Sequence, residues 1–401
     1  MESFSNWLPP SGSGYFLIEA IFASFAGITA LLLFILIRRA RRRSYFRRHD
    51  LLAFTIRKQW SEILSGAVDP EFWREDPMRR AIVQEFILRD LDVASPKDRS
   101  RLQEFMRENG LLDDCIEQAR KGHAWQRRNA LVMLGATLMP EAIPVLAEAL
   151  DDPQLETRLA AVRGLGRTGL TQAAVPILER LMINGLNIPA HPISNALLRC
   201  CEEHPEMLLP YIRPAYGEVR EILARVTAEI ALPQMADEIL LLAGDLLPEV
   251  RASSARALTV VPLPLALPAL AGLARDSVWY VRLRAVASLD SMRHPRTIPI
   301  LLEALCDANR FVRLRAAAAL SEFIKERTHI LENVVDSHDR YALHAMISAL
   351  ELAGDFGKVI ENLSDPSQHG MAAARLLNAL REGAANLWST EPLDPVLQGL
   401  I

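Results

Sequence analysis

Apolar and polar residues follow three successive patterns along the chain. From Tyr15 to Ile37 the sequence YFLIEAIFASFAGITALLLFILI is almost continuously apolar, with Glu19 as its single ionisable residue. From Asp50 to about Gly122 apolar residues recur partly at helical spacing, and beyond Gly122 the helical pattern itself repeats. No stretch shows the strict alternation typical of strands. The patterns therefore predict an all-α protein.

The first pattern predicts a transmembrane helix over residues 15–37. At about 1.5 Å per residue, this run is long enough to cross a hydrocarbon core of about 30 Å. A cleaved signal peptide is the rival interpretation. The run is long for a signal peptide, no basic residue precedes it, and a dense basic cluster follows it, so a retained anchor is favoured.

A cluster of arginines directly follows the apolar run. Residues 1–14 carry only Glu2 as a charged residue. The positive-inside rule therefore predicts a helix that crosses a bacterial inner membrane once, with the N-terminus outside and the chain after the helix in the cytoplasm. We expect the cluster also to contact anionic lipid head groups. Glu19 and small residue pairs such as Ala23 and Gly27 leave open whether the helix packs against another helix. The cluster consists of Arg38, Arg39, Arg41, Arg42, Arg43, Arg47 and Arg48.

The third pattern is an internal repeat with a period of 31 residues. Six arginines share its register, while Pro189 and His344 occupy the two remaining places. An aspartate stands six residues before the arginine in four repeats, and a second apolar phrase such as AIPVLAEAL or TIPILLEAL carries a proline near a helix start. Each repeat is thus a helical hairpin that must stack on its neighbours to bury its apolar face. The register arginines are Arg127, Arg158, Arg220, Arg251, Arg282 and Arg313, and the aspartates are Asp152, Asp245, Asp276 and Asp307.

The phrases DSVWYVRLRAVASL and DANRFVRLRAAAAL resemble the HEAT-repeat family, especially the short bacterial repeats related to the HEAT-like repeats of phycobilisome lyases. The resemblance covers about residues 122–327. It implies an α-solenoid of about seven to eight hairpins with an extended concave surface for protein recognition. It also implies irregular or capping units at Pro189 and His344.

We therefore expect six segments in order along the chain. Ser95, Pro96 and Asp98 predict a helix start within the fourth of these segments, through an N-cap, a first-turn proline and an acid that complements the helix dipole. The segments are an extracytoplasmic N-terminus (1–14), the transmembrane helix (15–37), a basic juxtamembrane segment (38–49), a helical adaptor (50–121), the solenoid (122–330) and a degenerate repeat with a C-terminal cap (331–401).

Composition and motifs point away from catalysis. A chain with 50% hydrophobic and 23% charged residues is a folded protein, and its net charge of −4 disfavours nucleic-acid binding. Phosphate-binding loops, serine-hydrolase elbows and zincin motifs are missing from the sequence, and its four cysteines, Cys115, Cys200, Cys201 and Cys306, have no metal-ligand spacing. The Asp336, His338, Asp339 and His344 grouping likewise lacks it. We expect no enzymatic activity, cofactor or metal.

Two sets of charged residues recur with the repeat. The aspartates and arginines at fixed spacing predict a structural ladder of ion pairs between repeats, made of Asp152, Arg158, Asp245, Arg251, Asp276, Arg282, Asp307 and Arg313. A second set lies two or five residues after the register arginine, on the side of the helix opposite the buried positions. This set predicts a basic stripe that faces a partner, with a solvated face as the competing interpretation. Its members are Arg163, Arg225, Arg256, Arg284 and Arg315.

The sequence thus predicts a membrane-anchored cytoplasmic HEAT-repeat scaffold that binds a membrane-associated protein. An envelope polysaccharide synthase or transport complex is the candidate assembly. The alternative is a bilin-lyase-like HEAT enzyme or a chaperone of a chromophore protein. Nucleic-acid binding through the arginine stripe is a third interpretation, which the acidic repeat region disfavours.

The arginine cluster generates a topology prediction. A reporter fused after Ile401 should be active on the cytoplasmic side, because arginines follow the apolar run and none precedes it. Paired cytoplasmic and periplasmic reporters at the same position would measure this. Activity of the periplasmic reporter would overturn the assigned orientation.

Overall fold

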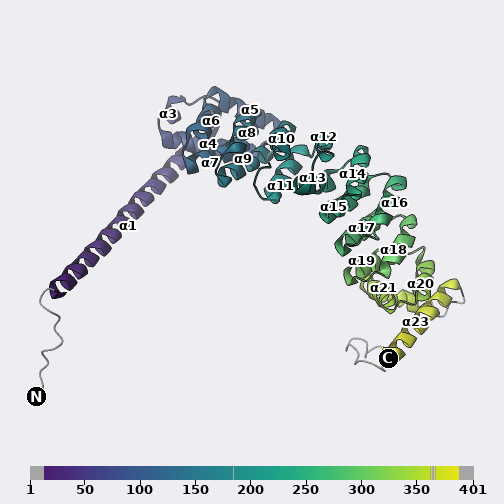
Figure 1. The fold of residues 1–401 in the computed structure, drawn as a ribbon. Coiled ribbons are helices and arrows are strands. Elements are labelled where there is room, and N and C mark those ends of the chain that lie inside the picture. Colours follow the sequence, from purple (N-terminus) through teal and green to yellow (C-terminus); the bar gives the residue numbers. More distant parts are fainter. Residues whose placement is uncertain (1–12, 184, 362, 364, 366, 388–401) are drawn as a thin grey trace, which may run out of the picture. The chain divides into compact units, whose positions relative to one another are not determined.

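The computed structural model describes residues 13–183, 185–361, 363, 365 and 367–387, and all the regular elements in this part of the chain are helical (Figure 1). The predicted N-terminal segment 1–14 and the last fourteen residues of the predicted cap fall almost wholly outside it. The chain divides into two compact units, residues 1–114 and 115–401. The helix that spans this division, α6, ends at Lys121.

The first unit begins with one long helix followed by a small helical bundle. Ser95 caps its fifth helix as the sequence predicts, because its side chain accepts a hydrogen bond from the backbone N–H of Asp98 and Pro96 occupies the first turn. The helices are α1 (Ser13–Lys58), α2 (Trp60–Leu64), α3 (Glu71–Arg74), α4 (Pro77–Val93), α5 (Pro96–Glu108) and α6 (Leu111–Lys121), the last of which continues into the second unit.

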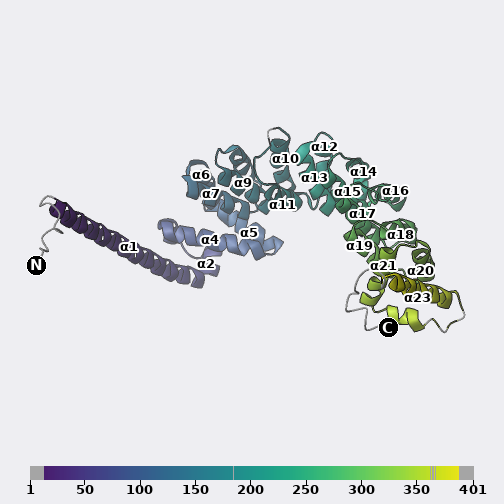
Figure 2. The same cartoon turned by 60° about the horizontal axis from the view of Figure 1, so that its bottom comes forward.

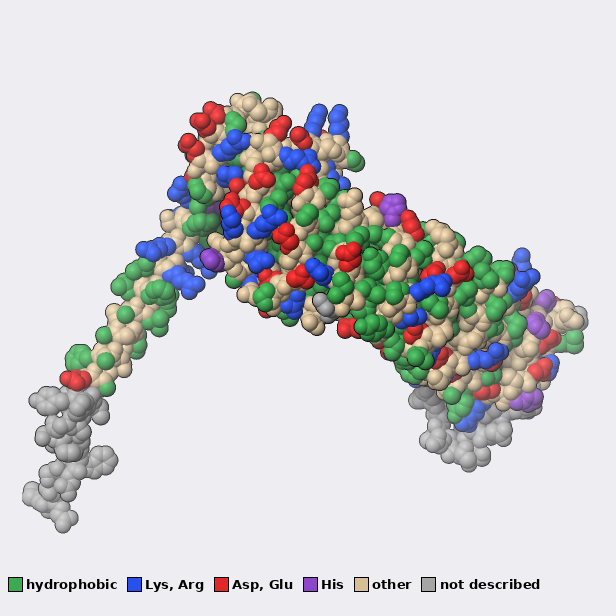
Figure 3. Space-filling model, turned by 45° about the horizontal axis from the view of Figure 1, so that its top comes forward, with side chains coloured by type: hydrophobic (Ala, Val, Ile, Leu, Met, Phe, Trp, Pro, Cys, Tyr) green, Lys and Arg blue, Asp and Glu red, His purple; other side chains and the backbone are tan. Residues whose placement is uncertain are grey.

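Helix α1 runs through the apolar segment, the basic segment and the start of the predicted adaptor without a break. Its 46 residues correspond to about 69 Å at 1.5 Å per residue. Within the described residues it is the one helix long and apolar enough to cross a membrane, and none of that apolar stretch is buried. Figure 3 shows its exposed hydrophobic side chains along the rod, followed by blue arginines. A signal sequence near the N-terminus would also meet this criterion of length and composition.

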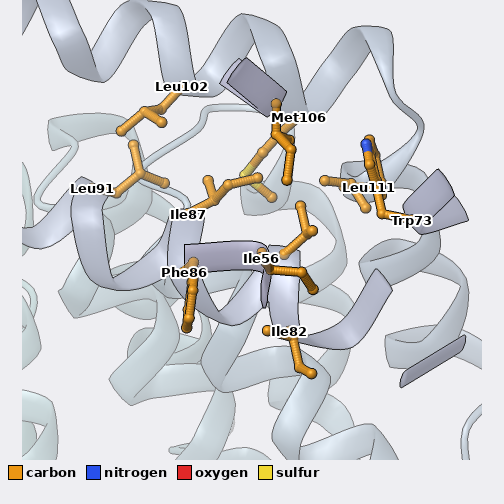
Figure 4. Packing of buried hydrophobic residues seen from close by; sticks show 11 residues of the cluster. Ile56, Trp73, Ile82, Phe86, Ile87, Leu91, Leu102, Met106 and Leu111 are labelled. Atoms are coloured by element: carbon orange, nitrogen blue, oxygen red, sulfur yellow. The ribbon is translucent and has the colours of Figure 1, made fainter. Parts of the chain in front are cut away.

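The last turns of α1 belong to the core of the first unit. Ile56 packs with Ile82 and Ile87 of α4 and with Met106 of α5 in one buried cluster (Figure 4). Trp60 of α2 donates its Nε1–H to Asp90 Oδ2 at 2.8 Å, which satisfies the indole while its ring packs on Phe86. Residues that follow the apolar run thus form a packed helical domain.

The second unit is a stack of helical hairpins in two layers (Figures 1 and 2). One layer, here called the inner helices, lines the concave side of the stack, and each member packs on the next. The inner helices are α7 (Ala124–Ala136), α9 (Leu155–Thr168), α11 (Ala190–Cys201), α13 (Gly217–Ile230), α15 (Pro248–Ala257), α17 (Trp279–Met292), α19 (Arg310–Ser321) and α21 (Arg340–Leu352).

The other layer, the outer helices, lies on the convex side and is built from the proline-containing apolar phrases. Short 3-10 turns precede or follow several of its members: η2 (Ala149–Asp151), η3 (Thr171–Ala173), η4 (Pro205–Leu208), η5 (Pro233–Met235), η6 (Leu258–Val260) and η7 (Pro295–Thr297). The outer helices are α8 (Ala142–Glu148), α10 (Ala174–Ile183), α12 (Leu209–Ile212), α14 (Ala236–Ala243), α16 (Leu263–Leu273), α18 (Ile298–Leu305) and α20 (Arg327–Asp336). Helices α22 (Phe356–Glu361) and α23 (Gln368–Leu387) end the described chain, and α23 packs on α20.

Two repeats are irregular at the places where the sequence leaves the register. Pro189 is the N-cap of α11, so it does not occupy the structural place of a register arginine, which is the fourth residue after the N-cap in the regular repeats. The following outer helix α12 has only four residues. The last hairpin is one residue shorter: α21 begins after Asp339, whereas α19 begins after Asn309, 30 residues earlier. His344 therefore does not occupy the structural place of a register arginine.

Small residues let the first inner helices approach closely. A Cβ atom on Gly135 of α7 would lie 2.5 Å from the Cα and carbonyl oxygen of Gly164 in α9, and one on Gly166 would lie 2.6 Å from Cα of Ala196 in α11. Such distances are far inside van der Waals contact. Glycine at these positions is therefore required by helix packing and not by backbone conformation.

This packing predicts that Gly135→Ala destabilises the solenoid. The new methyl group meets backbone atoms that cannot rotate away, and the overpacking cost of about 1–3 kcal/mol exceeds the gain in helix propensity of about 1 kcal/mol. Gly272→Ala in α16 is the matched control, since nothing lies within 4 Å of its new Cβ. Urea unfolding should show a lower midpoint for Gly135→Ala and an equal or higher one for the control. Equal midpoints for Gly135→Ala and the unmodified chain would refute the close approach.

Candidate partner-binding surface of the inner helices

The turns between repeats are joined by arginine side chains that reach both ways. Arg251 Nη1 donates to the carbonyl oxygens of Asp245 and Leu246 in its own repeat, at 2.9 and 3.0 Å. Its Nε and Nη2 donate to both carboxylate oxygens of Asp276 in the next repeat, at 2.6 and 2.9 Å. One guanidinium thus uses all of its edges, and it does so across the repeat boundary.

The same arrangement recurs along the stack. Arg282 forms the corresponding pair of bonds with Asp307, at 2.6 and 2.9 Å, and Arg220 and Arg127 contact Asp245 and Asp152 at 2.5 and 2.9 Å. The aspartate that pairs with each arginine lies 25 residues after it. The aspartate six residues before the arginine contributes its backbone carbonyl instead.

Two of the ladder arginines, Arg158 and Arg313, have no aspartate 25 residues later in the chain to pair with. Arg158 donates its Nε and Nη2 to the backbone carbonyls of Leu186 and Asn187, at 3.1 and 3.2 Å, because the irregular third repeat supplies main chain where the others supply a carboxylate. Arg313 keeps the two bonds to carbonyls of its own repeat, at 2.7 and 3.0 Å, and its guanidinium carbon lies 5.0 Å from the centroid of the Tyr341 ring.

The ladder sets the protonation of its aspartates. Burial acts to raise the pKa of Asp276, but the hydrogen bonds from Arg251 and from the backbone N–H of Val278, together with the positive charge of Arg251, outweigh it, and the pKa is lowered. The pKa of Asp307 is lowered by the same balance, with Arg282 and the N–H of Asn309 as donors. Both carboxylates are therefore ionised at neutral pH.

All five arginines of the predicted stripe are exposed on the inner helices, but they fall into two groups. Arg256 binds both carboxylate oxygens of Glu229, and Arg315 pairs with Asp290 at 2.8 Å. Both acids lie near the end of the preceding inner helix, so these two arginines make a second set of contacts between repeats. Arg163, Arg225 and Arg284 have no hydrogen-bond or ion-pair partner among the described residues.

Sequence reasoning missed the acids that engage Arg256 and Arg315. Glu229 stands nine residues after Arg220, and Asp290 eight residues after Arg282, so neither belongs to one repeating column. The available signal was an acid in the last turn of one inner helix facing an arginine in the middle of the next. Figure 3 shows another face of the second unit, where Lys, Arg, Asp and Glu side chains lie beside a broad hydrophobic area.

The basic cluster of α1 lies on an exposed length of helix. All seven of its arginines are exposed, from Arg38 to Arg48. Arg48 pairs with Asp76 at 3.0 Å, and the Arg42 guanidinium lies 5.6 Å from the ring centroid of Phe46. The remaining arginines of the cluster are exposed as well.

The adjacent Cys200 and Cys201 have the character of packed thiols. Burial raises the pKa of Cys200 to about 12, with the neighbouring thiol of Cys201 adding to the shift, and burial alone raises that of Cys201 to about 12. At neutral pH both remain protonated and weakly nucleophilic. In the part of the chain that the structure describes, no three His, Cys, Asp or Glu side chains lie close enough to hold a metal ion.

The ladder predicts a pH-dependent effect of removing one arginine. Arg251→Gln should lower the free energy of unfolding at pH 7 by about 1–3 kcal/mol, because Asp276 is left as a buried carboxylate without its partner. The pKa of Asp276 is lowered in the folded state, so its contribution is present above the unfolded pKa of about 3.9 and is lost as the pH falls through the lower folded value. The difference from the unmodified chain should therefore shrink below about pH 4.

Urea unfolding at pH 7 and near pH 3 measures this difference. Arg284→Gln is the control, since this exposed arginine has no partner in the described chain and should change stability little at either pH. A constant difference between Arg251→Gln and the unmodified chain at both pH values would show that the charge pair is not its source.

Comparison with known proteins bears on the repeats. The family model of HEAT repeats matches residues 112–186 and 271–351. No curated protein matches the chain.

Among solved structures, an engineered protein is 14% identical (75% of this chain, 96% of that chain, TM-score 0.37). YibA of E. coli is 17% identical (67% and 96%, TM-score 0.33), and the complex of CpcE and CpcF of phycocyanin lyase from Nostoc sp. is 17% identical (67% and 94%, TM-score 0.24). With TM-scores this low, these three likenesses carry no argument about function. The family match and the two-layered stack of hairpins together identify residues 112–186 and 271–351 of this chain as HEAT repeats of an α-solenoid.

Proposed function

We propose that this chain is a scaffold that binds a protein partner through the inner helices of its solenoid while α1 anchors it to a membrane. The observation that carries the proposal is the group of three exposed arginines without partners, Arg163, Arg225 and Arg284, on inner helices α9, α13 and α17. We call them the free arginines. The helices that carry them line the concave side of the stack (Figure 1), the surface that solenoids use for extended contacts.

The solenoid supports binding because it is stiff where these side chains project. The ladder and the close inner-helix packing hold the backbone, so little conformational entropy is lost when a partner docks. Each free guanidinium offers a planar set of donors to a carboxylate or a carbonyl group. Arg256 and Arg315 contribute less to this surface, because their donors are already engaged by Glu229 and Asp290.

Membrane anchoring is the second part of the proposal. The exposed apolar length of α1 and the exposed arginines that follow it support a single span of a bacterial inner membrane, with the solenoid on its cytoplasmic side. Because α1 continues directly into the core of the first unit, the anchor and that unit are joined without a flexible linker. The partner proposed is itself membrane-associated, such as an envelope polysaccharide synthase or transport complex.

Replacing the three free arginines tests the binding surface. Arg163→Ser, Arg225→Ser and Arg284→Ser together should leave the melting temperature nearly unchanged, because exposed residues without partners contribute little to stability. The same variant should lose proteins that co-purify with the detergent-solubilised unmodified chain after crosslinking in cells. Quantitative mass spectrometry measures the loss.

A matched control removes the same charge elsewhere. Lys97→Ser, Arg296→Ser and Lys325→Ser replace three exposed cations that lie off the inner helices. This control should capture the same proteins as the unmodified chain. If the free-arginine variant melts normally and still captures every one of them, the inner helices are not the recognition surface.

A further inference from the structure

Exposed aromatic rings stand at the start of the last three inner helices. Trp279 of α17, Phe311 of α19 and Tyr341 of α21 are 42%, 60% and 52% exposed. The rings of Trp279 and Phe311 lie against each other, with centroids 5.9 Å apart. Large aromatic side chains at this level of exposure, clustered on successive repeats, are typical of interfaces.

The cation beside these rings is Arg313, a ladder arginine whose Nε and Nη2 are not engaged by an acceptor of the described chain. Arg251 and Arg282 each direct Nε and Nη2 at an aspartate, and Arg158 directs them at backbone carbonyls. For Arg313 neither nitrogen has a hydrogen-bond acceptor among the described residues, although its Nη1 makes the usual two bonds within the repeat. Its guanidinium is thus held in the ladder position and contacts the Tyr341 ring instead of a carboxylate.

The reason is a serine in the place of the next ladder aspartate. Asp276 and Asp307 each accept a hydrogen bond from the backbone N–H two residues on, at 2.9 and 2.7 Å. Ser337 does the same through its hydroxyl, which accepts from the N–H of Asp339 at 3.3 Å. Because the last hairpin is one residue shorter, Ser337 and not His338 is the counterpart of Asp307, and its hydroxyl brings no negative charge to Arg313.

The surroundings of Arg313 are also positively charged. Arg310 is exposed and has no partner in the described chain, and Arg340 stacks on the Tyr341 ring, 4.7 Å from its centroid. The nearby acids are occupied: Asp307 pairs with Arg282, and Asp339 caps α21 by accepting the N–H groups of its first turn. None of these three guanidinium groups, which lie beside an aromatic surface, forms a hydrogen bond or ion pair with a carboxylate of the described chain.

We propose that this edge of α17, α19 and α21 binds an acidic, apolar peptide segment of a partner protein, with one carboxylate seated on Nε and Nη2 of Arg313. The inference rests on the proposed protein-binding function and names the chemistry of the partner. The carboxylate takes the place that an aspartate of the next repeat holds against Arg251 and Arg282. Arg310 and Arg340 attract further acids, and the apolar side chains of the peptide pack on the exposed surfaces of the Trp279 and Phe311 rings.

A peptide fits this edge better than a nucleic acid. Arg313 offers the same two donors, Nε and Nη2, with which Arg282 binds the carboxylate of Asp307. Trp279 and Phe311 contact each other, so no base can enter between them as on a platform for single strands.

The test uses the detergent-solubilised full-length chain and a fluorescein-labelled ten-residue peptide of alternating aspartate and leucine. Fluorescence anisotropy should show binding of this peptide and little binding of a peptide with asparagine in place of aspartate. Arg310→Gln and Phe311→Ala should each weaken binding about tenfold or more, which corresponds to about 1.4 kcal/mol. Both side chains are exposed, so the melting temperature should change little.

Ser337→Asp should change stability and peptide binding in opposite directions, which an ordinary surface substitution would not do. The new carboxylate should complete the ladder to Arg313, raise the melting temperature and abolish peptide binding in the same variant. Ser337→Asn is the matched control: it has nearly the same shape without the charge, and should bind the peptide as the unmodified chain does.

Three results would overturn the proposal: equal binding of the aspartate and asparagine peptides, unchanged peptide binding by Ser337→Asp, or tighter binding of an oligothymidine of similar length. Any of these outcomes leaves the proposed scaffold function standing if the free-arginine variant still loses its partners. If the free-arginine variant instead keeps its partners, the peptide site and the proposed scaffold function are both contradicted.

Discussion

The solenoid depends on a guanidinium shared between consecutive turns. Each regular ladder arginine satisfies two carbonyls of its own repeat and the carboxylate of the next, so the turn of one hairpin fixes the position of the following one. The carboxylates are largely shielded from water, with side-chain exposures of 9% for Asp276 and 7% for Asp307. A half-buried charge pair of this kind is costly to break from one side, because the remaining charge keeps its desolvation penalty.

The inner and outer helices beside the ladder differ in the size of the residues with which they pack. Inner helices carry alanine and glycine where they meet, and the glycines of α7 and α9 bring backbones into contact. The outer helices, most of which contain proline and larger apolar residues, lie on the convex side. The free arginines are exposed side chains of these inner helices.

The regular part of this architecture could be predicted from sequence because its chemistry repeats. A 31-residue period in arginine, alanine and leucine is enough to predict hairpins, stacking and a ladder between repeats, and Ser95 with Pro96 is enough to predict the start of α5. The contacts of Arg256 and Arg315 were not predictable in the same way. Their partners, Glu229 and Asp290, occupy different columns, so only the superposition of neighbouring helices brings them within reach.

The irregular repeats show the same limit. A one-residue shortening moves the start of α21, and counting by 31 then aligns His338 with the ladder aspartates although Ser337 makes their backbone contact. Alignment by period fails wherever a loop changes length, whereas alignment by hydrogen bond does not. The continuity of α1 from the apolar run into the first core was likewise hidden by the arginines in its middle, which are as compatible with a linker as with an exposed helix.

The ladder contact can be measured most directly by a double-mutant cycle between Arg282 and Asp307. Free energies of unfolding would be compared for the unmodified chain, Arg282→Gln, Asp307→Asn and the double variant in urea at pH 7. A bidentate, largely buried charge pair between repeats should give a coupling energy of about 1–3 kcal/mol. A coupling energy near zero, with the single variants additive, would contradict the account, since the arginine would then stabilise its own turn alone.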